Sequence, residues 1–208
     1  MTTWLHEQRL QAARAAVRES GATSVLDLGC GDGDLLIRLA AEPGIARIVG
    51  IDLCGDALGR LRARLDALAP KAVAEVDLVQ GSMTDARASL AGFDCAVLIE
   101  TIEHIEPDRL SVLERALFVV MRPATVIITT PNAEFNSLLG VPSHRFRHPG
   151  HRFEWDRAKF QRWAGGVAAR NSYAVACRDI GDRHPALGGA SQMAVFDLAR
   201  RPGGRLAA

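Results

Sequence analysis

The chain has 208 residues, a net charge of +1, and a composition that is 48% hydrophobic and 24% charged. These values are typical of one ordinary globular domain, and the balanced charge excludes a uniformly basic nucleic-acid-binding protein. The longest apolar runs are far shorter than the ~20 residues of a membrane-spanning helix, and the first eleven residues lack the features of a secretory signal. Four cysteines without a CxxC pair predict free thiols, no disulfide framework, no zinc knuckle and a cytoplasmic location.

Charge is distributed unevenly along the chain. Acidic residues outnumber basic ones by 15 to 7 over residues 27–108, whereas basic residues lead by 9 to 4 over residues 145–183. Arginine makes up 23 of the 25 basic residues. Its planar guanidinium suits phosphate recognition, although an arginine-rich proteome would produce the same excess. The separation of an acidic and a basic half indicates a polyanionic partner on one side.

Apolar periodicity predicts strands that alternate with helices over the first 130 residues. The predicted helices cover residues 4–20, 33–41, 56–68 and 107–121. The predicted strands cover residues 24–28, 47–51, 75–79, 93–99 and 124–130. This alternation is typical of a parallel sheet that is covered by helices on both faces.

The pattern changes after Pro131. Residues 132–154 resemble a long loop, and loops of this length are usually functional or disordered. A helix over 156–169 follows, and two strands over 173–179 and 192–199 are close enough to pair antiparallel. We therefore predict an α/β fold over residues 1–200, with a mostly parallel sheet and an antiparallel edge hairpin. The tail over residues 201–208 is expected to be frayed.

A glycine-rich loop follows the first predicted strand. Gly29, Gly31 and Gly33 stand at alternate positions, where they allow a tight turn and the close approach of a ligand to the backbone. A dinucleotide-binding fingerprint would need its third glycine at position 34, which is an aspartate. The loop therefore indicates a ligand other than a dinucleotide.

Acidic residues around this loop indicate the charge of that ligand. Asp27 and Asp32 would repel a pyrophosphate and suit cationic amine and sulfonium groups. Asp52 ends the second strand, where a carboxylate can accept both hydroxyls of a ribose, and Ser82 and Met83 follow the third strand, where they can contact an adenine edge. This set resembles the cofactor site of the class I S-adenosylmethionine-dependent methyltransferases, which have a Rossmann-like fold.

Two carboxylates and an imidazole follow the fourth predicted strand. A helical turn there would place Glu100, Glu103 and His104 on one face, at the edge where open α/β sheets hold their sites. Converging carboxylates repel each other unless a positive group lies between them, which favours a metal ion; the alternative is a solvated helix start. His151 from the long loop can complete a set of two Glu and two His, which suits Mn²⁺ or Fe²⁺, with Zn²⁺ also open.

Three motifs together resemble the small-RNA 3′-terminal 2′-O-methyltransferases, the HUA-enhancer group. This family includes plant microRNA methylases, animal piRNA methylases and the methylase half of a bacterial RNA-repair complex. The motifs are ExxEH at 100–104, TPNAEFN at 130–136 and HRFEW at 151–155, and the resemblance runs from about residue 5 to residue 199. It implies that one metal ion, preferably Mn²⁺ but also Mg²⁺, Co²⁺ or Fe²⁺, is held by Glu100, Glu103, His104 and His151 and takes part in catalysis.

The resemblance also implies a reaction: methyl transfer from S-adenosylmethionine to the 2′-hydroxyl of the 3′-terminal nucleotide of a small or cleaved RNA. A divalent ion that binds both terminal hydroxyls would activate the nucleophile and select the RNA end. Arg147 resembles a basic residue near that end, and we expect it to contact RNA together with Arg145 and Arg152. An RNA-repair kinase or ligase is an expected partner.

The chain departs from the family pattern at two positions. Gly150 stands where an Asp commonly precedes the last ligand, and Asp156 stands where a Thr is common. Two other functions remain open: a small-molecule O-methyltransferase, which needs neither the four ligands nor the basic loop, and a non-catalytic binding module. Trp155 and Trp163 could stack on a base, but packing in the core is the more expected role.

Overall fold

The computed structural model describes residues 4–68, 73–85 and 87–199, so the predicted tail over 201–208 lies outside the described residues. Seven strands form one sheet in the order β3-β2-β1-β4-β5-β7-β6. The strands are β1 (Ser24–Leu28), β2 (Arg47–Asp52), β3 (Glu75–Gln80), β4 (Cys95–Ile99), β5 (Thr125–Pro131), β6 (Tyr173–Ile180) and β7 (Ser191–Leu198). The first five run parallel, and β7 lies antiparallel between β5 and β6, which confirms the predicted mixed sheet.

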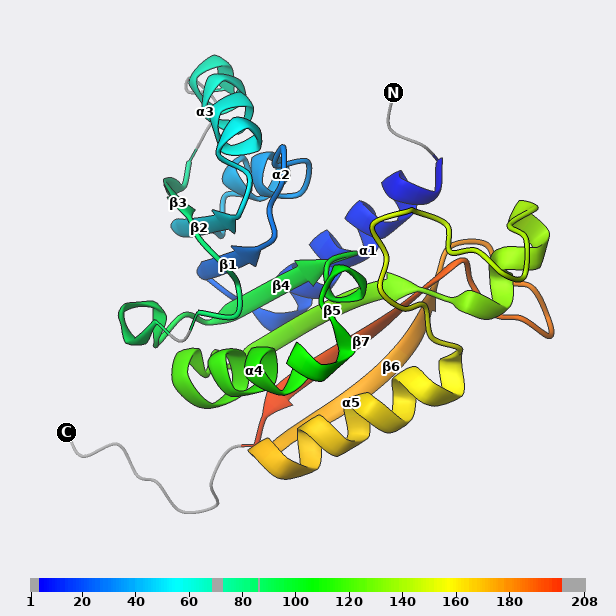
Figure 1. Ribbon diagram of the computed structural model, residues 1–208. Coiled ribbons are helices and arrows are strands. Elements are labelled where there is room, and N and C mark those ends of the chain that lie inside the picture. The colour runs from blue at the N-terminus through cyan, green and yellow to red at the C-terminus, as the bar shows by residue number, and fades with distance from the viewer. Residues whose placement is uncertain (1–3, 69–72, 86, 200–208) are drawn as a thin grey trace.

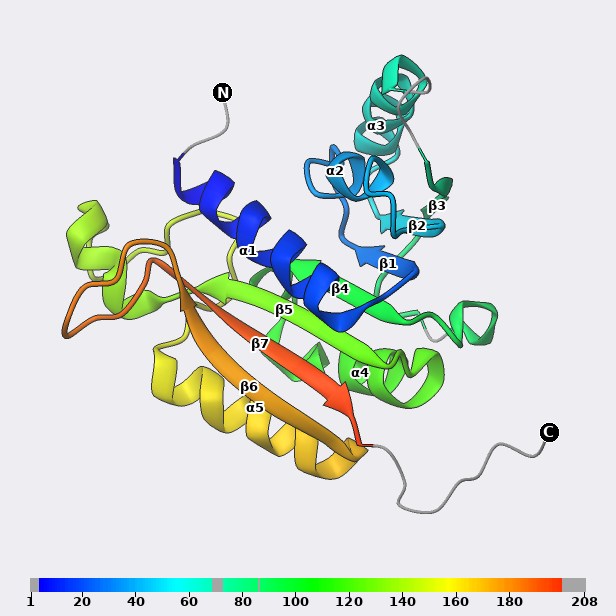
Figure 2. The ribbon, with the colours of Figure 1, turned by 180° about the vertical axis from the view of Figure 1, so that it is seen from behind.

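Helices cover both faces of this sheet (Figures 1 and 2). One face carries α1 (Trp4–Ser20), α2 (Leu36–Ala40) and α3 (Gly55–Leu68), whose leucines and alanines pack on alternate strand residues. The other face carries α4 (Leu110–Glu114), its π-helical continuation η4 (Arg115–Met121) and α5 (Arg157–Asn171). The phenylalanines Phe118, Phe160 and Phe196 are fully buried on this second face.

The predicted strands agree with the observed ones to within two residues. The predicted helix over 33–41 is shorter than expected, because Gly29, Gly31 and Gly33 have φ angles of 82°, 52° and 79° and the chain is still turning there. The long stretch after β5 contains a 3₁₀ helix, η5 (Ala133–Leu139). All four cysteines are free, and no helix among the described residues is long and apolar enough to cross a membrane.

The topology places the candidate site at one edge of the sheet. Parallel strands end at the same edge, and the strand order reverses between β1 and β4, where open α/β sheets bind their ligands. The glycine loop follows β1 at this point, and the 3₁₀ turn η2 (Ile102–His104) follows β4. Residues that are distant in the sequence therefore meet beside the switch point.

Candidate active site

A cavity of about 280 Å³ lies between α1 and the glycine loop. It reaches from the end of β1 to the end of β4, so it occupies the switch point of the sheet. Its walls are His6, Leu10, Asp27, Gly29, Cys30, Gly31, Asp32, Asp34, Leu35, Ile99 and Glu100. The cavity therefore joins the predicted cofactor loop to one of the predicted metal ligands.

The glycine loop is held by backbone contacts and by Asp52. A side chain at Gly29 would collide with the methyl group of Thr101, which explains the glycine there. One carboxylate oxygen of Asp52 accepts a hydrogen bond from the Gly31 amide, and the other accepts one from the Cys54 amide, both at 2.8 Å. Each carboxylate oxygen has a second lone pair, so Asp52 keeps acceptor capacity toward a ribose.

Asp27 is the acidic residue buried in the floor of the cavity. Its side chain is 3% exposed, and burial raises the pKa of its carboxyl to about 7, with a further contribution from the charge of Asp52. A cationic amine placed in the cavity would favour the ionised carboxylate. The predicted role of Asp27 toward a cationic ligand therefore agrees with its position.

This burial gives an expected pH dependence. With a pKa of about 7, Asp27 takes up a proton as the pH falls, so the affinity for a cationic ligand such as S-adenosylmethionine is expected to decrease about tenfold per pH unit below 7. Calorimetric titration of the cofactor between about pH 5 and 8, where many proteins are most stable, measures this slope. Asp27→Asn should bind weakly with a flat profile, whereas an unchanged slope in that variant would assign the titration to another group.

The same pKa shift of Asp27 also makes the folding stability of the protein depend on pH. The carboxyl has an ordinary pKa of 3.8 and a folded pKa of about 7, so between these values the folded protein holds a proton that the unfolded chain has lost. The contribution of Asp27 to stability is therefore complete at low pH and is lost as the pH rises through 7.

The other two acids of the loop face arginines of α3. Asp32 pairs with Arg60 at 2.8 Å, and Asp34 pairs with Arg64 at 2.9 Å. The sequence suggested that Asp32 would face a cationic group of the ligand. In the structure Asp32 instead faces a cation of the protein itself, Arg60. His6 of α1 also contacts Asp34 at 3.1 Å, which connects α1 to the loop.

Ser82 and Met83 lie in the turn after β3. The Ser82 hydroxyl hydrogen-bonds to the Thr84 hydroxyl at 2.7 Å and accepts a hydrogen bond from the Thr84 amide at 3.1 Å. The Met83 side chain packs beside Gly29 and against the core. Neither residue lines the cavity, so their predicted contact with an adenine stays a prediction.

Glu100 and Glu103 follow β4 but not in the single helical turn that the sequence suggested. Glu100 has a left-handed φ of 52°, an unusual conformation for a glutamate, and its Oε1 accepts a hydrogen bond from Thr129 at 3.0 Å. Glu103 is fully buried, and its Oε2 accepts a hydrogen bond from Thr130 at 3.0 Å. Its Oε1 has no hydrogen-bond partner among the described residues.

Burial raises the pKa of both glutamates. For Glu103 the pKa lies well above its ordinary value, because desolvation is joined by repulsion from Glu100. For Glu100 desolvation also raises the pKa, while the charge of Arg9 lowers it. A partly buried carboxyl, Glu100, and a fully buried one, Glu103, whose Oε1 has no partner among the described residues, form an environment that a divalent cation would stabilise.

The two predicted histidine ligands lie side by side, with ring centroids 4.8 Å apart. The Nδ1 of His104 donates to the Gly150 carbonyl at 3.1 Å, and the Nδ1 of His151 donates to the Glu154 carboxylate at 2.5 Å. With Nδ1 protonated in this way, the Nε2 lone pair of each ring is left for a metal ion. Glu154 therefore supplies the orienting carboxylate that Gly150 lacks.

The structure does not gather the four predicted ligands within coordination distance of one another. The described residues contain one cluster whose candidate ligand atoms lie within 4.8 Å of one another, and its members are His104, His148 and His151. Glu100 and Glu103 are outside this cluster, although the charge of His151 acts on Glu100. His148 was not predicted as a ligand, and its position three residues before His151 was the available signal.

Arg9 is a site residue that the sequence did not reveal. Its guanidinium lies 3.4 Å from the Oε2 of Glu100, and only 16% of its side chain is exposed. It arrives from α1, whose apolar periodicity identifies the buried Leu10 and Ala13 but says nothing about their polar neighbour. In this structure Arg9 supplies the positive charge that faces Glu100.

The three predicted RNA-contacting arginines differ in exposure. Arg145 is exposed, and Arg152 is exposed and pairs with Glu106 at 3.0 Å. The guanidinium of Arg147 instead donates to Asn136 and to the carbonyls of Asn132 and Ala190, so it holds the long loop to the sheet. Its contact with an RNA phosphate stays a prediction.

The two tryptophans considered for base stacking belong to the interior. Trp155 is 6% exposed and stacks on Phe153 with a centroid distance of 4.2 Å, and Trp163 packs against the same core.

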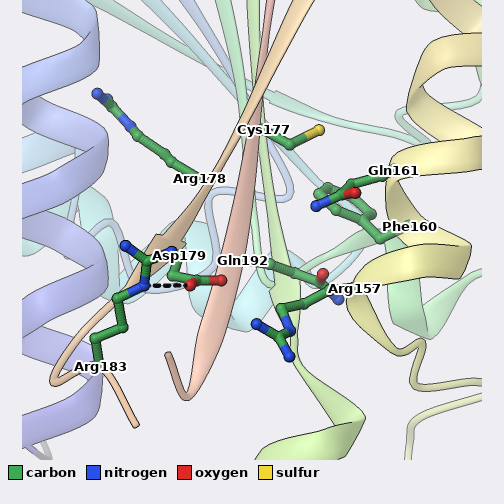
Figure 3. A pocket seen from close by; sticks show the side chains of 8 residues that line it. All are labelled: Arg157, Phe160, Gln161, Cys177, Arg178, Asp179, Arg183 and Gln192. Atoms are coloured by element: carbon green, nitrogen blue, oxygen red, sulfur yellow. Dashed lines mark hydrogen bonds and ion pairs between the residues drawn. The ribbon is translucent and has the colours of Figure 1, made fainter. Parts of the chain in front are cut away.

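A small cavity of about 120 Å³ lies between α5 and the strands β6 and β7, where Arg183 pairs with Asp179 (Figure 3). None of the predicted site residues, all of which are described, lines that cavity.

The chain is similar to known methyltransferases. A family model described as a methyltransferase domain matches residues 25–124. A small RNA 2′-O-methyltransferase of Xenopus tropicalis is 40% identical over 202 residues, which cover 92% of this chain and 54% of that protein. This chain therefore spans about half the length of that relative.

Two solved structures extend the comparison. The methyltransferase domain of bacterial CtHen1 matches with a TM-score of 0.83 and 38% identity, covering 94% of this chain and 100% of that one. The small RNA methyltransferase HEN1 matches with a TM-score of 0.87 and 32% identity, covering 93% of this chain and 26% of that one. Because the bacterial domain is matched over its whole length, this chain belongs to the small RNA 2′-O-methyltransferase family.

Proposed function

We propose that this protein transfers a methyl group from S-adenosylmethionine to the 2′-hydroxyl of the 3′-terminal nucleotide of an RNA, in a reaction that depends on a divalent cation. Family membership supports the cofactor and the RNA substrate. The observation that carries the metal dependence is the buried oxygen of Glu103 that has no hydrogen-bond partner among the described residues. The neighbouring rings of His104 and His151, whose Nδ1 atoms are hydrogen-bonded, add two nitrogen donors at the same edge of the sheet. The family resemblance supports the terminal specificity.

The donor set fits a cation of intermediate hardness. Glu100 and Glu103 offer carboxylate oxygens, and His104 and His151 offer imidazole nitrogens, a mixture that suits Mn²⁺ and related ions. When bound there, such an ion lowers the pKa of a hydroxyl group that it coordinates. Glu154 keeps His151 in the tautomer that presents Nε2, and Arg9 faces Glu100.

The remaining residues bind and align the reactants. Asp27 would hold the cofactor from the floor of the cavity, and Asp52 would hold it from the end of the second strand. A sulfonium methyl is already electrophilic, so the protein mainly has to align an in-line displacement and exclude water. Glu100 borders the cofactor cavity, so a cation that Glu100 helps to hold would lie close to the methyl donor.

A single-turnover assay tests this proposal. Labelled S-adenosylmethionine and a short RNA with a 2′,3′-dihydroxyl end are mixed with Mn²⁺ or with excess chelator. We expect label in the RNA only when Mn²⁺ is present. Transfer to phenols or quinols but not to RNA would favour a small-molecule enzyme, and cofactor binding without transfer would favour a binding module.

Asp52 should control cofactor affinity. Its carboxylate is predicted to accept both ribose hydroxyls, and charge-assisted hydrogen bonds contribute about 1.5–3 kcal/mol each. Asp52→Asn should therefore weaken S-adenosylmethionine binding at least tenfold in calorimetry, since a shift of ~1.4 kcal/mol is tenfold. Asp56→Asn, an exposed position at the start of α3, is the matched control. Equal affinities of the two variants would remove Asp52 from the cofactor site.

The exposed arginines should make RNA binding sensitive to salt. Each phosphate that an arginine neutralises releases counterions, so Arg145→Ala should lower the slope of log affinity against log salt concentration by about 1. Arg62→Ala on the exposed side of α3 should leave the slope unchanged. RNA affinity that is equal at low and high salt would contradict the phosphate contacts of this segment.

An RNA-repair kinase or ligase is the proposed partner. Hen1 occurs in a solved Pnkp1/Rnl/Hen1 RNA repair complex, and the matching chain has 23% identity and a TM-score of 0.66 to this one. That likeness concerns the fold, so the partner is supported mainly by the family resemblance. Co-purification of this chain with such an enzyme from cells tests the association.

A further inference from the structure

A second large cavity, of about 490 Å³, lies in the long loop after β5. It opens between η5 and the segment 141–146. Val141, Pro142 and Phe146 give it an apolar wall, and Arg145 adds a positive charge. Phe146 is 47% exposed, whereas the other aromatic residues of this loop and of α5 are buried or partly buried.

The cavity borders the predicted metal centre. Glu154 contributes to its lining, and the same carboxylate accepts the hydrogen bond from His151 at 2.5 Å. Another predicted ligand, Glu100, contributes to the lining of the cofactor cavity. Each of the two cavities therefore shares a lining residue with the predicted metal centre or with the carboxylate that orients it.

The chemistry of the second cavity differs from that of the first. The cofactor cavity is lined by Asp27, Asp32 and Asp34, whereas the second cavity has an exposed aromatic ring and Arg145. The second cavity is also lined by two carboxylates, Glu134 and Glu154, which pair with Arg157 and His151. Unstacked bases at single-stranded RNA ends are commonly bound on aromatic side chains, and every base offers a π-face for this contact. Arginine beside such a ring suits the phosphate of the same nucleotide.

We propose that this cavity binds the base of the 3′-terminal nucleotide, stacked on Phe146, with Arg145 at its phosphate. The inference rests on the proposed function, because the terminal ribose must lie at the metal centre while its base enters the adjoining cavity. Phe146 is then a specificity-determining residue for an unpaired 3′ end. Stacking accepts all four bases, so the site selects an end that is free to leave a duplex.

A binding assay tests the cavity without turnover. An RNA with 2-aminopurine as its 3′-terminal base is titrated with the protein, and the fluorescence of that base is recorded. Stacking should quench it in the unmodified protein and in Phe146→Tyr. Phe146→Ala should abolish the quenching and weaken binding about tenfold, the usual size of one base–aromatic contact. Leu138→Ala is the matched control, because Leu138 is 52% exposed on η5 but does not line the cavity.

A turnover assay separates this inference from the proposed function. One RNA ends in adenosine, and a second ends in a stable abasic ribose that keeps both hydroxyls. In the unmodified protein we expect the KM for the abasic RNA to be about tenfold higher than the KM for the RNA that ends in adenosine. In Phe146→Ala we expect the two RNAs to have the same KM. Equal KM values for the two RNAs, or quenching that survives in Phe146→Ala, would overturn the base site while methylation stands. If neither RNA is methylated, the proposed function itself would be overturned.

Discussion

Replacing Glu103 with glutamine is expected to reduce methylation by several orders of magnitude while cofactor binding survives. Glutamine keeps the shape of the side chain and can accept the hydrogen bond from Thr130, so the fold should be retained. It removes the buried negative charge that is predicted to hold the cation, and with it the activation of the hydroxyl. Calorimetric titration with Mn²⁺ and single-turnover methylation measure the two losses.

Glu106→Gln is the matched control for this variant. Glu106 lies three residues further along the chain, but its side chain is 55% exposed and pairs with Arg152. The Glu106→Gln variant should bind Mn²⁺ and methylate RNA as the unmodified protein does. Full Mn²⁺ affinity in Glu103→Gln would exclude Glu103 as a ligand, and a Glu103→Gln protein that has lost S-adenosylmethionine affinity as well would indicate general damage to the site.

The second large effect concerns the RNA end. RNAs that end in a 3′-deoxy or 3′-phosphate nucleotide should lose almost all methylation, although their 2′-hydroxyl is intact. One change removes an oxygen donor to the cation, and the other brings further negative charge against Glu100 and Glu103. General-base catalysis contributes about 10²–10⁴-fold and needs no second hydroxyl, so it predicts no such dependence on the 3′ group.

Single-turnover rates of methylation on the three RNA ends, each measured with Mn²⁺ and with chelator, distinguish metal activation from general-base catalysis. The 2′,3′-dihydroxyl end should be methylated rapidly only with Mn²⁺, and the other two ends slowly in both conditions. Binding of all three RNAs is measured in parallel, so that a loss of affinity is separated from a loss of chemistry. Similar rates on all ends, or full activity in chelator, would contradict an ion that binds both terminal hydroxyls.

The central strands of the sheet could be predicted because they are buried on both faces. In β1 four of five residues are buried, and such continuous apolar runs are visible in the sequence. The start of α2 could not be predicted, since apolar periodicity carries no information about the left-handed backbone of Gly31 and Gly33. The division of the helix before β5 into 3₁₀, α and π segments has the same origin in backbone geometry.

The site was predictable where the topology of the sheet brings two recognised motifs to the same edge. His104 and His151 were expected to meet, and they do. Glu154 was visible in the sequence three residues after His151, but only the structure shows its carboxylate on the ring. Arg9 comes from a helix at the other end of the chain, and no spacing in the sequence connects it to Glu100.

The surroundings of Glu100 have a consequence for biosynthesis. Its Oε2 lies 3.4 Å from Arg9 and 3.5 Å from the hydroxyl of Ser191, and these two side chains also contact each other at 3.5 Å. Ser191 begins β7, which is inserted between β5 and β6. A ribosome delivers Arg9 182 residues before Ser191, and contacts so distant in sequence form slowly. Glu100 therefore acquires its final neighbours only after β7 has been synthesised, when the cofactor loop has already emerged.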